Sequence, residues 1–212
     1  MAIGNPIKKL LKKIFKRIYL VGFHENLSEE REARRTSFKM KATFDDSTYL
    51  EETCTIFNPN NDSSRVTIGK NSIIKGELLL FSHGGKITIG DYCHIGVLSR
   101  IWSAKNIIIG DRVLIAHNVN IHDNISHPLD SLERHKDFKH ILNIGLQKDI
   151  DLREAEVIIE DDVWIGFNTT ILKGTRIGKG SVIGANCLIT EDVPPFAIVI
   201  NKVNTEIIRY TT

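Results

Sequence analysis

The sequence has few cysteines, no large excess of one charge and no long apolar run. Each of these features argues against a class of protein. The three cysteines, Cys54, Cys93 and Cys187, are far apart and form no CxxC pair, which argues against a disulfide framework or a zinc knuckle. Lysine and arginine exceed aspartate and glutamate by only two, so no overall field favours a nucleic-acid partner. The uncharged run IYLVGF is too short to cross a bilayer or to form a signal-peptide core. We therefore expect a cytoplasmic protein.

A six-residue repeat dominates what is present. Between residues 157 and 193 isoleucine recurs at every sixth position, at Ile159, Ile165, Ile171, Ile177, Ile183 and Ile189. A period of six fits neither an amphipathic helix nor one continuous strand. It fits a solenoid in which each hexad gives one short strand with a β-branched residue facing inward, followed by a tight corner. Three hexads complete one coil, so the repeat predicts an all-β domain, a parallel β-helix.

The repeat extends towards the N-terminus with small slips in register. A recurring phrase marks at least five coils, as VTIGK, ITIGD, IIIGD, VIIED and TRIGK, which begin at Val66, Ile87, Ile107, Val157 and Thr175. Strand-like segments already start near residue 48, which would add a sixth coil. We predict three regions: an N-terminal helix and connector over residues 1–47, the β-helix over 48–200, and a tail over 201–212.

Residues 6–23 place apolar side chains at helical spacing and lysine and arginine on the other face, which predicts a basic amphipathic helix. Such a helix can bind the anionic inner face of the cell membrane, or its apolar stripe can cap the open end of the solenoid. Both interpretations stay open. The following polar stretch contains EEREARR, which suits a short exposed helix.

The hexads stop after Ile121 and resume at Ile159, and the residues between them are polar and aperiodic. We predict a long inserted loop over residues 127–156. Long loops in compact domains are often functional, so the chemistry is expected there. His122 and His127 stand at its root, and an imidazole that titrates near neutrality can accept the proton of an alcohol or amine.

The repeats, the His-Pro pair at His127–Pro128 and the run IGKGSVIGANCLITEDVPP together resemble the hexapeptide-repeat acyltransferases of the maltose and galactoside type. The resemblance implies a left-handed β-helix, a homotrimer with active sites between subunits, acetyl-CoA as co-substrate and no metal. The loop ending in LREAEVIIEDDVWIG resembles the branch that O-acetylates sugars of surface polysaccharides such as O-antigen, part of lipopolysaccharide, or capsule. We therefore predict an O-acetyltransferase that acts on a sugar hydroxyl of such a polysaccharide or its precursor.

The resemblance also implies roles for individual residues. His127 occupies the place of the catalytic base, and we choose Asp123 as its orienting partner, with Asp130 and Glu133 as alternatives. Arg134, Trp164 and Trp102 are candidates for binding the acceptor sugar. Donor-binding positions of the family correspond to Phe167, Ala185 and Thr190, and Lys202 is a further candidate for binding the donor.

Two departures from the family pattern matter. The closing phrase reads NKVNTE in place of the usual GNPAK or GVPAR, and Lys202 or Arg209 would have to take over recognition of the nucleotide end of coenzyme A. The asparagine with which galactoside relatives contact sugar falls on Gly96.

Three other functions remain open at this point. An amino-sugar N-acetyltransferase would use the same histidine and donor groove. The HxxxxH spacing of His117 and His122 also occurs in γ-class carbonic anhydrases, which bind zinc on this fold, although His94 does not stand at the spacing of their third ligand. A non-catalytic scaffold would not need the His-Pro loop.

Overall fold

The structure, a computed structural model, describes residues 12–13, 16 and 29–202, and it divides the chain into two units, Met1–Lys39 and Met40–Thr212. In the first unit, residues 29–39 are helical, as EEREARR predicted, and the Arg34 guanidinium lies 5.1 Å from the centre of the Phe38 ring. Lys12, Lys13 and Lys16 are helical and exposed. The rest of the predicted amphipathic helix, residues 6–23, lies outside the described residues.

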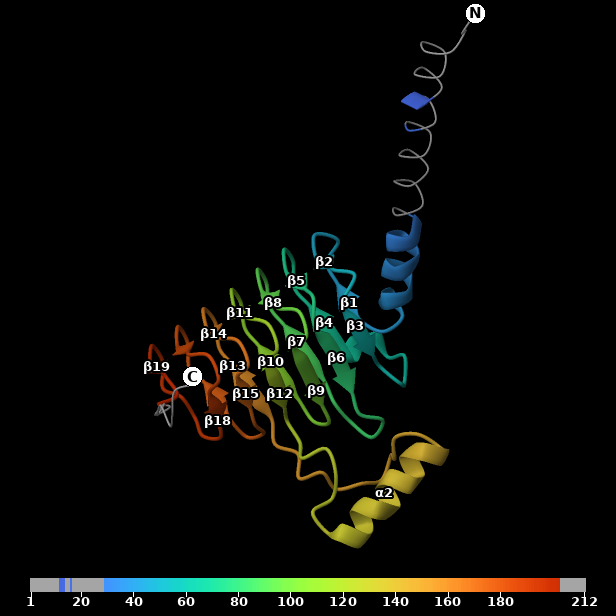
Figure 1. The fold of residues 1–212 in the computed structure, drawn as a ribbon, viewed down its shortest axis with the longest axis vertical. Coiled ribbons are helices and arrows are strands. Elements are labelled where there is room, and N and C mark those ends of the chain that lie inside the picture. Colours follow the sequence, from blue (N-terminus) through green and yellow to red (C-terminus); the bar gives the residue numbers. More distant parts are fainter. Residues whose placement is uncertain (1–11, 14–15, 17–28, 203–212) are drawn as a thin grey trace, which may run out of the picture. The chain divides into compact units, whose positions relative to one another are not determined.

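The second unit is a left-handed parallel β-helix, as predicted, with three sheets whose strands all run parallel (Figure 1). Sheet A contains β1 (Thr43–Phe44), β4 (Val66–Ile68), β7 (Ile87–Ile89), β10 (Ile107–Ile109), β13 (Val157–Ile159) and β16 (Arg176–Ile177). Sheet B contains β2 (Tyr49–Leu50), β5 (Ile73–Ile74), β8 (His94–Ile95), β11 (Leu114–Ile115), β14 (Trp164–Ile165), β17 (Val182–Ile183) and β19 (Ile198–Val199). Sheet C contains β3 (Thr55–Phe57), β6 (Glu77–Leu80), β9 (Arg100–Ser103), β12 (Asn120–His122), β15 (Thr170–Ile171) and β18 (Leu188–Ile189).

Inward-facing aliphatic side chains form the core, and the predicted hexad positions supply them. Each of these positions is buried, namely Ile68, Ile74, Leu80, Ile89, Ile95, Ile101, Ile109, Ile115, Ile121, Ile159, Ile165, Ile171, Ile177, Ile183 and Ile189. Full burial of one such side chain stabilises the fold by about 1.5–3 kcal/mol relative to exposure. The phase of the repeat, and hence which side of each strand faces inward, is confirmed.

The β-helix begins earlier than residue 48. Strand β1 pairs in parallel with β4, with Thr43 beside Thr67 and Phe44 beside Ile68. The stretch assigned to the connector therefore supplies the first strand of a complete coil, followed by the 3-10 turn Ser63–Arg65. Within the described residues there are six complete coils and, in β19, one strand of a seventh.

The corners between sheets B and C use left-handed backbone. Asn118, Asn168 and Asn186 stand at equivalent places in successive coils with φ of 55°, 57° and 59°. Asparagine tolerates this conformation better than most residues. The same corner of an earlier coil contains Leu98, with φ of 62° and 65% of its surface exposed.

The insertion interrupts the coils without disturbing their register. Ile107 of β10 pairs with Val157 of β13, and Asp161 Oδ1 accepts a hydrogen bond of 3.0 Å from the backbone N–H of Asp111, fifty residues away. The inserted loop was predicted without secondary structure, but it contains helix α2 (Ser131–Asn143). Asp130 caps this helix by accepting hydrogen bonds from the backbone of Leu132 and Glu133. Among the described residues, neither helix combines the length and apolarity needed to cross a membrane.

Candidate functional site

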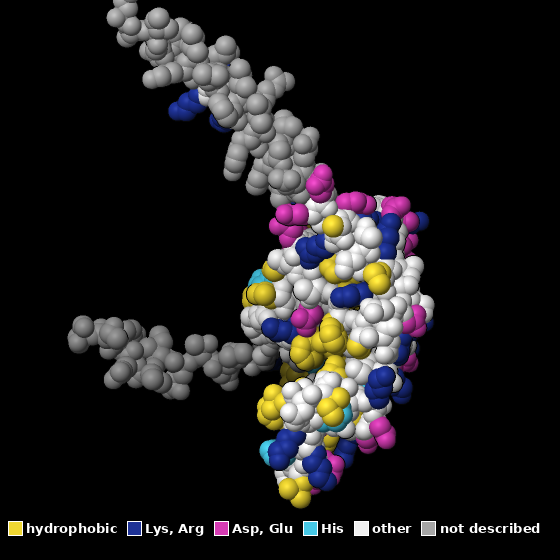
Figure 2. All heavy atoms as spheres, turned by 90° about the vertical axis from the view of Figure 1, so that its right-hand side faces the viewer, with side chains coloured by type: hydrophobic (Ala, Val, Ile, Leu, Met, Phe, Trp, Pro, Cys, Tyr) yellow, Lys and Arg dark blue, Asp and Glu magenta, His cyan; other side chains and the backbone are white. Residues whose placement is uncertain are grey.

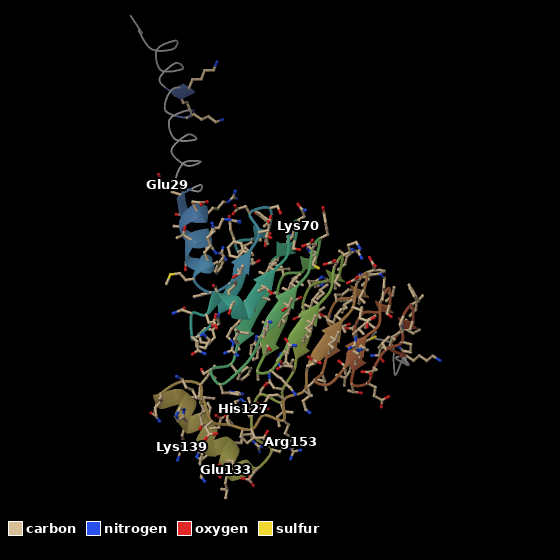
Figure 3. The ribbon with its side chains drawn as sticks, turned by 180° about the vertical axis from the view of Figure 1, so that it is seen from behind. Glu29, Lys70, His127, Glu133, Lys139 and Arg153 are labelled. Carbon is tan, nitrogen blue, oxygen red and sulfur yellow. The ribbon has the colours of Figure 1, made fainter. Side chains whose placement is uncertain are left out.

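His127 lies at the root of the insertion, five residues after strand β12 ends, and its ring is held by an aspartate from α2. The distance from His127 Nδ1 to Asp137 Oδ2 is 2.8 Å. The Asp137 side chain is 3% exposed, whereas that of His127 is 46% exposed. An ionised carboxylate can only accept, so in this contact Nδ1 is the donor, and in a neutral imidazole Nε2 then has the lone pair. The contact with Asp137 therefore orients the imidazole, and Figure 3 labels His127 beside the insertion.

A third residue completes this arrangement. Gln147 Nε2 donates a hydrogen bond of 2.9 Å to Asp137 Oδ1, so both carboxylate oxygens are engaged. Burial of a carboxylate is costly unless such partners replace its hydration. All three residues come from the insertion. We call His127, Asp137 and Gln147 the loop triad.

Asp123, our choice for the partner of His127, has a different role. It is fully buried, and its carboxylate accepts hydrogen bonds from Ser103 Oγ, the backbone N–H groups of Ala104 and Lys105, and Asn124 Nδ2, at 2.7–3.0 Å. The structure thus places it as an anchor of the insertion on the preceding coil.

The alternatives Asp130 and Glu133 are also engaged elsewhere. Asp130 caps α2, and Glu133 Oε1 binds Lys136 Nζ at 2.8 Å. Our sequence reasoning missed Asp137 because it predicted no helix in the loop. The available signal was the Asp130–Ser131 helix start, which would have placed Asp137 in the second turn on the face of Arg134 and Ile141.

Trp102 and His122 lie together on the outer side of sheet C. Their rings stack with centroids 4.9 Å apart, and Trp102 Nε1 donates to Glu77 Oε1 at 2.5 Å. Trp102 also packs against the buried cluster of Phe81, Ala104 and Leu152. Burial lowers the pKa of His122, while Asp123 opposes this shift and Arg100 adds to it. His122 is therefore suited to packing in its neutral form.

Trp164, Phe167 and Ala185 gather on another side of the coil. Trp164 faces outward from sheet B and is 54% exposed. The Phe167 ring lies at the next corner and stacks on His117, with centroids 5.2 Å apart and an interplanar angle of 3°. Ala185 follows one coil later, and a Cβ built on Gly166 would lie only 2.6 Å from its backbone nitrogen. These coils therefore approach closely at that corner.

Thr190, in contrast, follows β18 at the end of sheet C, the sheet whose strand β12 leads to His127. Within one chain the predicted site residues therefore form two groups. His127, Trp102 and Thr190 belong to the sheet C side, whereas Trp164, Phe167 and Ala185 belong to sheet B and its corner.

Arg134 serves the loop itself. Its Nη1 donates to the backbone carbonyls of Pro128 and Leu129, at 3.2 and 2.9 Å. Lys202 is exposed, and Arg209 lies outside the described residues. Gly96 cannot hold a larger residue without rearrangement, because an added Cβ would lie 2.5 Å from the backbone of Ala116.

The histidines considered as zinc ligands are not gathered in one place. His117 stacks on Phe167 and His122 on Trp102. In the part of the chain that the structure describes, no group of three or more His, Cys, Asp or Glu side chains is placed to share a metal ion.

Comparison with known proteins agrees with this fold. Residues 156–191 match the family described as bacterial transferase hexapeptide (six repeats). The matched segment contains strands β13 to β18, the coils that follow the insertion. It is 33% identical over 129 residues to galactoside O-acetyltransferase of Escherichia coli (strain K12), covering 61% of this chain and 56% of that protein. It is 30% identical over 127 residues to galactoside O-acetyltransferase of Lactococcus lactis, covering 60% and 55%. The chain thus spans about half the length of these curated relatives.

Solved structures show the same architecture. The polySia-specific acetyltransferase NeuO aligns with a TM-score of 0.53 and 27% identity, over 73% of this chain and 65% of that chain. AntD, an N-acyltransferase from Bacillus cereus, aligns with a TM-score of 0.59 and 19% identity, over 79% and 81%. At that identity, the likeness to AntD shows the fold alone.

Proposed function

We propose that this protein is an acetyl-CoA-dependent O-acetyltransferase that acetylates a sugar hydroxyl, in a surface polysaccharide or its precursor. The loop triad carries the proposal, because it presents an oriented imidazole at the root of the insertion on a hexapeptide solenoid. The similarity to galactoside O-acetyltransferases and to NeuO supports a sugar acceptor and an acetyl donor.

The proposed reaction is direct transfer. His127 Nε2 removes the proton of the sugar hydroxyl as the sugar oxygen attacks the thioester carbonyl of acetyl-CoA. Asp137 stabilises the imidazolium that forms, and a backbone N–H group stabilises the oxyanion. The carbon–sulfur bond then breaks, and the thiolate of coenzyme A takes the proton from His127. The products are the sugar acetate ester and coenzyme A.

We further propose that the enzyme is a homotrimer with its active sites between subunits. The outer face of sheet B presents one continuous row, Tyr49, Ile73, His94, Leu114, Trp164, Val182 and Ile198, in which each residue pairs with the next coil. Tyr49, Leu114, Trp164 and Ile198 are 48–75% exposed. A contiguous apolar row of this kind favours burial against another subunit. The site would then join His127 of one subunit to Trp164, Phe167 and Ala185 of its neighbour.

The donor is proposed to lie along the corner that contains Phe167 and Ala185, where the coils approach closely and the pantetheine amides would hydrogen-bond to the backbone. Thr190 and Lys202 remain proposed donor contacts. Transfer to nitrogen, as in an amino-sugar N-acetyltransferase, is the second candidate. A segment of 45 residues, 21% of this chain, is 56% identical to an N-acetyltransferase of Staphylococcus aureus, although that enzyme is named for tetrahydropyridine dicarboxylate and not for a sugar.

A coenzyme-A-release screen tests the proposal, using acetyl-CoA with free, nucleotide-linked and lipid-linked sugars. We expect release with a hydroxyl acceptor and a product that hydroxylamine cleaves, as it cleaves esters but not amides. His127→Ala should lower kcat by a factor on the order of a hundred to ten thousand. His135→Ala, an exposed histidine of α2, is the matched control. Wild-type turnover by His127→Ala would refute the assignment of the base, and stoichiometric zinc in the purified protein would favour the carbonic-anhydrase alternative.

A further inference from the structure

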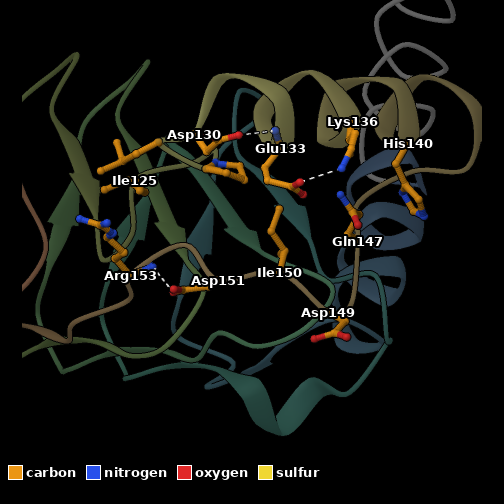
Figure 4. Close-up of a pocket in the computed structure, with 12 residues that line it drawn as sticks. Ile125, Asp130, Glu133, Lys136, His140, Gln147, Asp149, Ile150, Asp151 and Arg153 are labelled. Atoms are coloured by element: carbon orange, nitrogen blue, oxygen red, sulfur yellow. Dashed lines mark hydrogen bonds and ion pairs between the residues drawn. The ribbon is translucent and has the colours of Figure 1, made fainter.

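A cavity of about 550 Å³ lies inside the insertion, between α2 and the returning segment of residues 147–153 (Figure 4). Its apolar lining comes from Ile125, Pro128 and Leu129, which precede α2, and from Ile150 of the returning segment. Polar side chains, including those of α2, form the rest. This volume is within the range of pockets that bind small ligands, and it exceeds what a single sugar ring needs.

The cavity adjoins the loop triad through two residues. Pro128, which directly follows His127 in the chain, lines it. Gln147 lines it as well, and the same side chain donates to Asp137. A ligand in the cavity would therefore contact Gln147 of the loop triad and Pro128, whereas His127 and Asp137 themselves do not line the cavity.

Most charged groups of the lining already have partners. Asp130 caps α2, Glu133 binds Lys136, and Asp151 Oδ1 accepts a hydrogen bond of 2.8 Å from the backbone of Arg153. Within the described residues, two charged side chains of the lining form no hydrogen bond or ion pair, the carboxylate of Asp149 and the guanidinium of Arg153. Figure 4 shows them at opposite ends of the cavity, with Ile150 between them.

The net charge of the side chains that line the cavity limits which ligands it can bind. Four carboxylates, Asp130, Glu133, Asp149 and Asp151, face the cavity together with two cations, Lys136 and Arg153. An anionic ring would meet an excess of like charge, which is costly in a partly desolvated site. Hydroxyl groups can donate to Asp149 and accept from Arg153 and the other donors, and the apolar wall suits the less polar face of a sugar ring.

We propose that this cavity binds the sugar units next to the one that is acetylated, so the acceptor is an oligosaccharide without acidic groups rather than a monosaccharide. The inference rests on the proposed function, because it assigns the acetylated unit to His127. It adds a subsite formed by the insertion together with Ile125, which lies just before it in the chain.

The test uses the full-length protein, neutral tetrasaccharides and their component monosaccharides. Leu129→Trp should fill the cavity from its rim, since Leu129 is 59% exposed and lines it. We expect KM for a tetrasaccharide to rise by about tenfold, equivalent to loss of about 1.4 kcal/mol of binding, with kinetics on the monosaccharide unchanged. Leu132→Trp is the matched control, because Leu132 is 71% exposed on α2 and does not line the cavity.

Asp149→Ala is a second, milder variant that removes one unpaired group of the lining, and it should raise KM for the tetrasaccharide a fewfold. Saturation-transfer NMR of tetrasaccharide binding gives a readout that needs no catalysis. If acetyl transfer fails but binding persists and is lost in Leu129→Trp, the proposed function falls and the subsite stands. Equal KM for monosaccharide and tetrasaccharide, or binding that neither variant weakens, would overturn the subsite.

Discussion

The coils of this protein are built from a repeated sequence pattern, whereas the insertion is not. In the coils one residue type recurs in one orientation, so Ile109, Ile159 and Ile177 stack in the core with nearly the same environment. The insertion has no repeated position of this kind. Three different residues, His127, Asp137 and Gln147, lie there within hydrogen-bonding distance of one another in turn, from His127 to Asp137 and from Asp137 to Gln147. Repetition gives a rigid support but cannot by itself create a unique site. The chemistry is expected where the repeat is interrupted.

The insertion depends on the coils through a few buried contacts. Leu152, 1% exposed, packs with Phe81 and Ala104. His83 Nε2 lies 2.9 Å from Glu154 Oε1, and Asp123 joins the root of the insertion to residues 103–105. A local change in the insertion should therefore alter activity more than stability, and a change in the core should do the reverse.

Asp137→Asn is the strongest test of this contrast. The amide matches the carboxylate in size but cannot neutralise an imidazolium, and it no longer requires a proton on His127 Nδ1. We expect kcat to fall by a factor on the order of a hundred to ten thousand, while urea unfolding changes little. Glu191→Gln, an exposed carboxylate of the coil region, is the control. Turnover within twofold of wild type would show that Asp137 does not assist the base.

The reverse effect is expected for Ile109→Ala in strand β10. Ile109 is 1% exposed in the core, and its truncation should leave a cavity that lowers the free energy of unfolding by about 2–5 kcal/mol. Ile108→Ala is the matched control, because the neighbouring side chain faces outward on the same strand. Urea denaturation at a constant protein concentration measures both variants. Equal losses would mean that the two faces of the strand are buried alike.

The coils could be predicted from the sequence better than the insertion, and the reason is physical. A buried position that recurs every six residues is visible without structural knowledge, so Ile121 and Ile159 were placed on either side of the interruption. The partner of His127 was not visible in the same way, and Asp123 was preferred because it stands on the last coil before the insertion, where rigid backbone would fix it. Asp137 reaches the ring only because α2 folds back over the root of the insertion. Contacts that depend on a single tertiary arrangement leave no periodic signal.

The smallest effect that we predict concerns a corner of the coils. It tests how strictly the repeat determines which residue stands at that corner. Leu98 occupies the left-handed position that later coils fill with Asn118, Asn168 and Asn186, and Asn118 Nδ2 donates to Asn168 Oδ1 at 2.8 Å. Leu98→Asn should relieve the backbone strain and raise the free energy of unfolding by about 0.5–1 kcal/mol. Leu188→Asn is the control, since Leu188 is 64% exposed in strand β18, away from the left-handed corners. A loss of stability in Leu98→Asn would mean that the leucine is retained for a contact on its exposed side, such as the proposed subunit interface, rather than tolerated as a departure from the repeat.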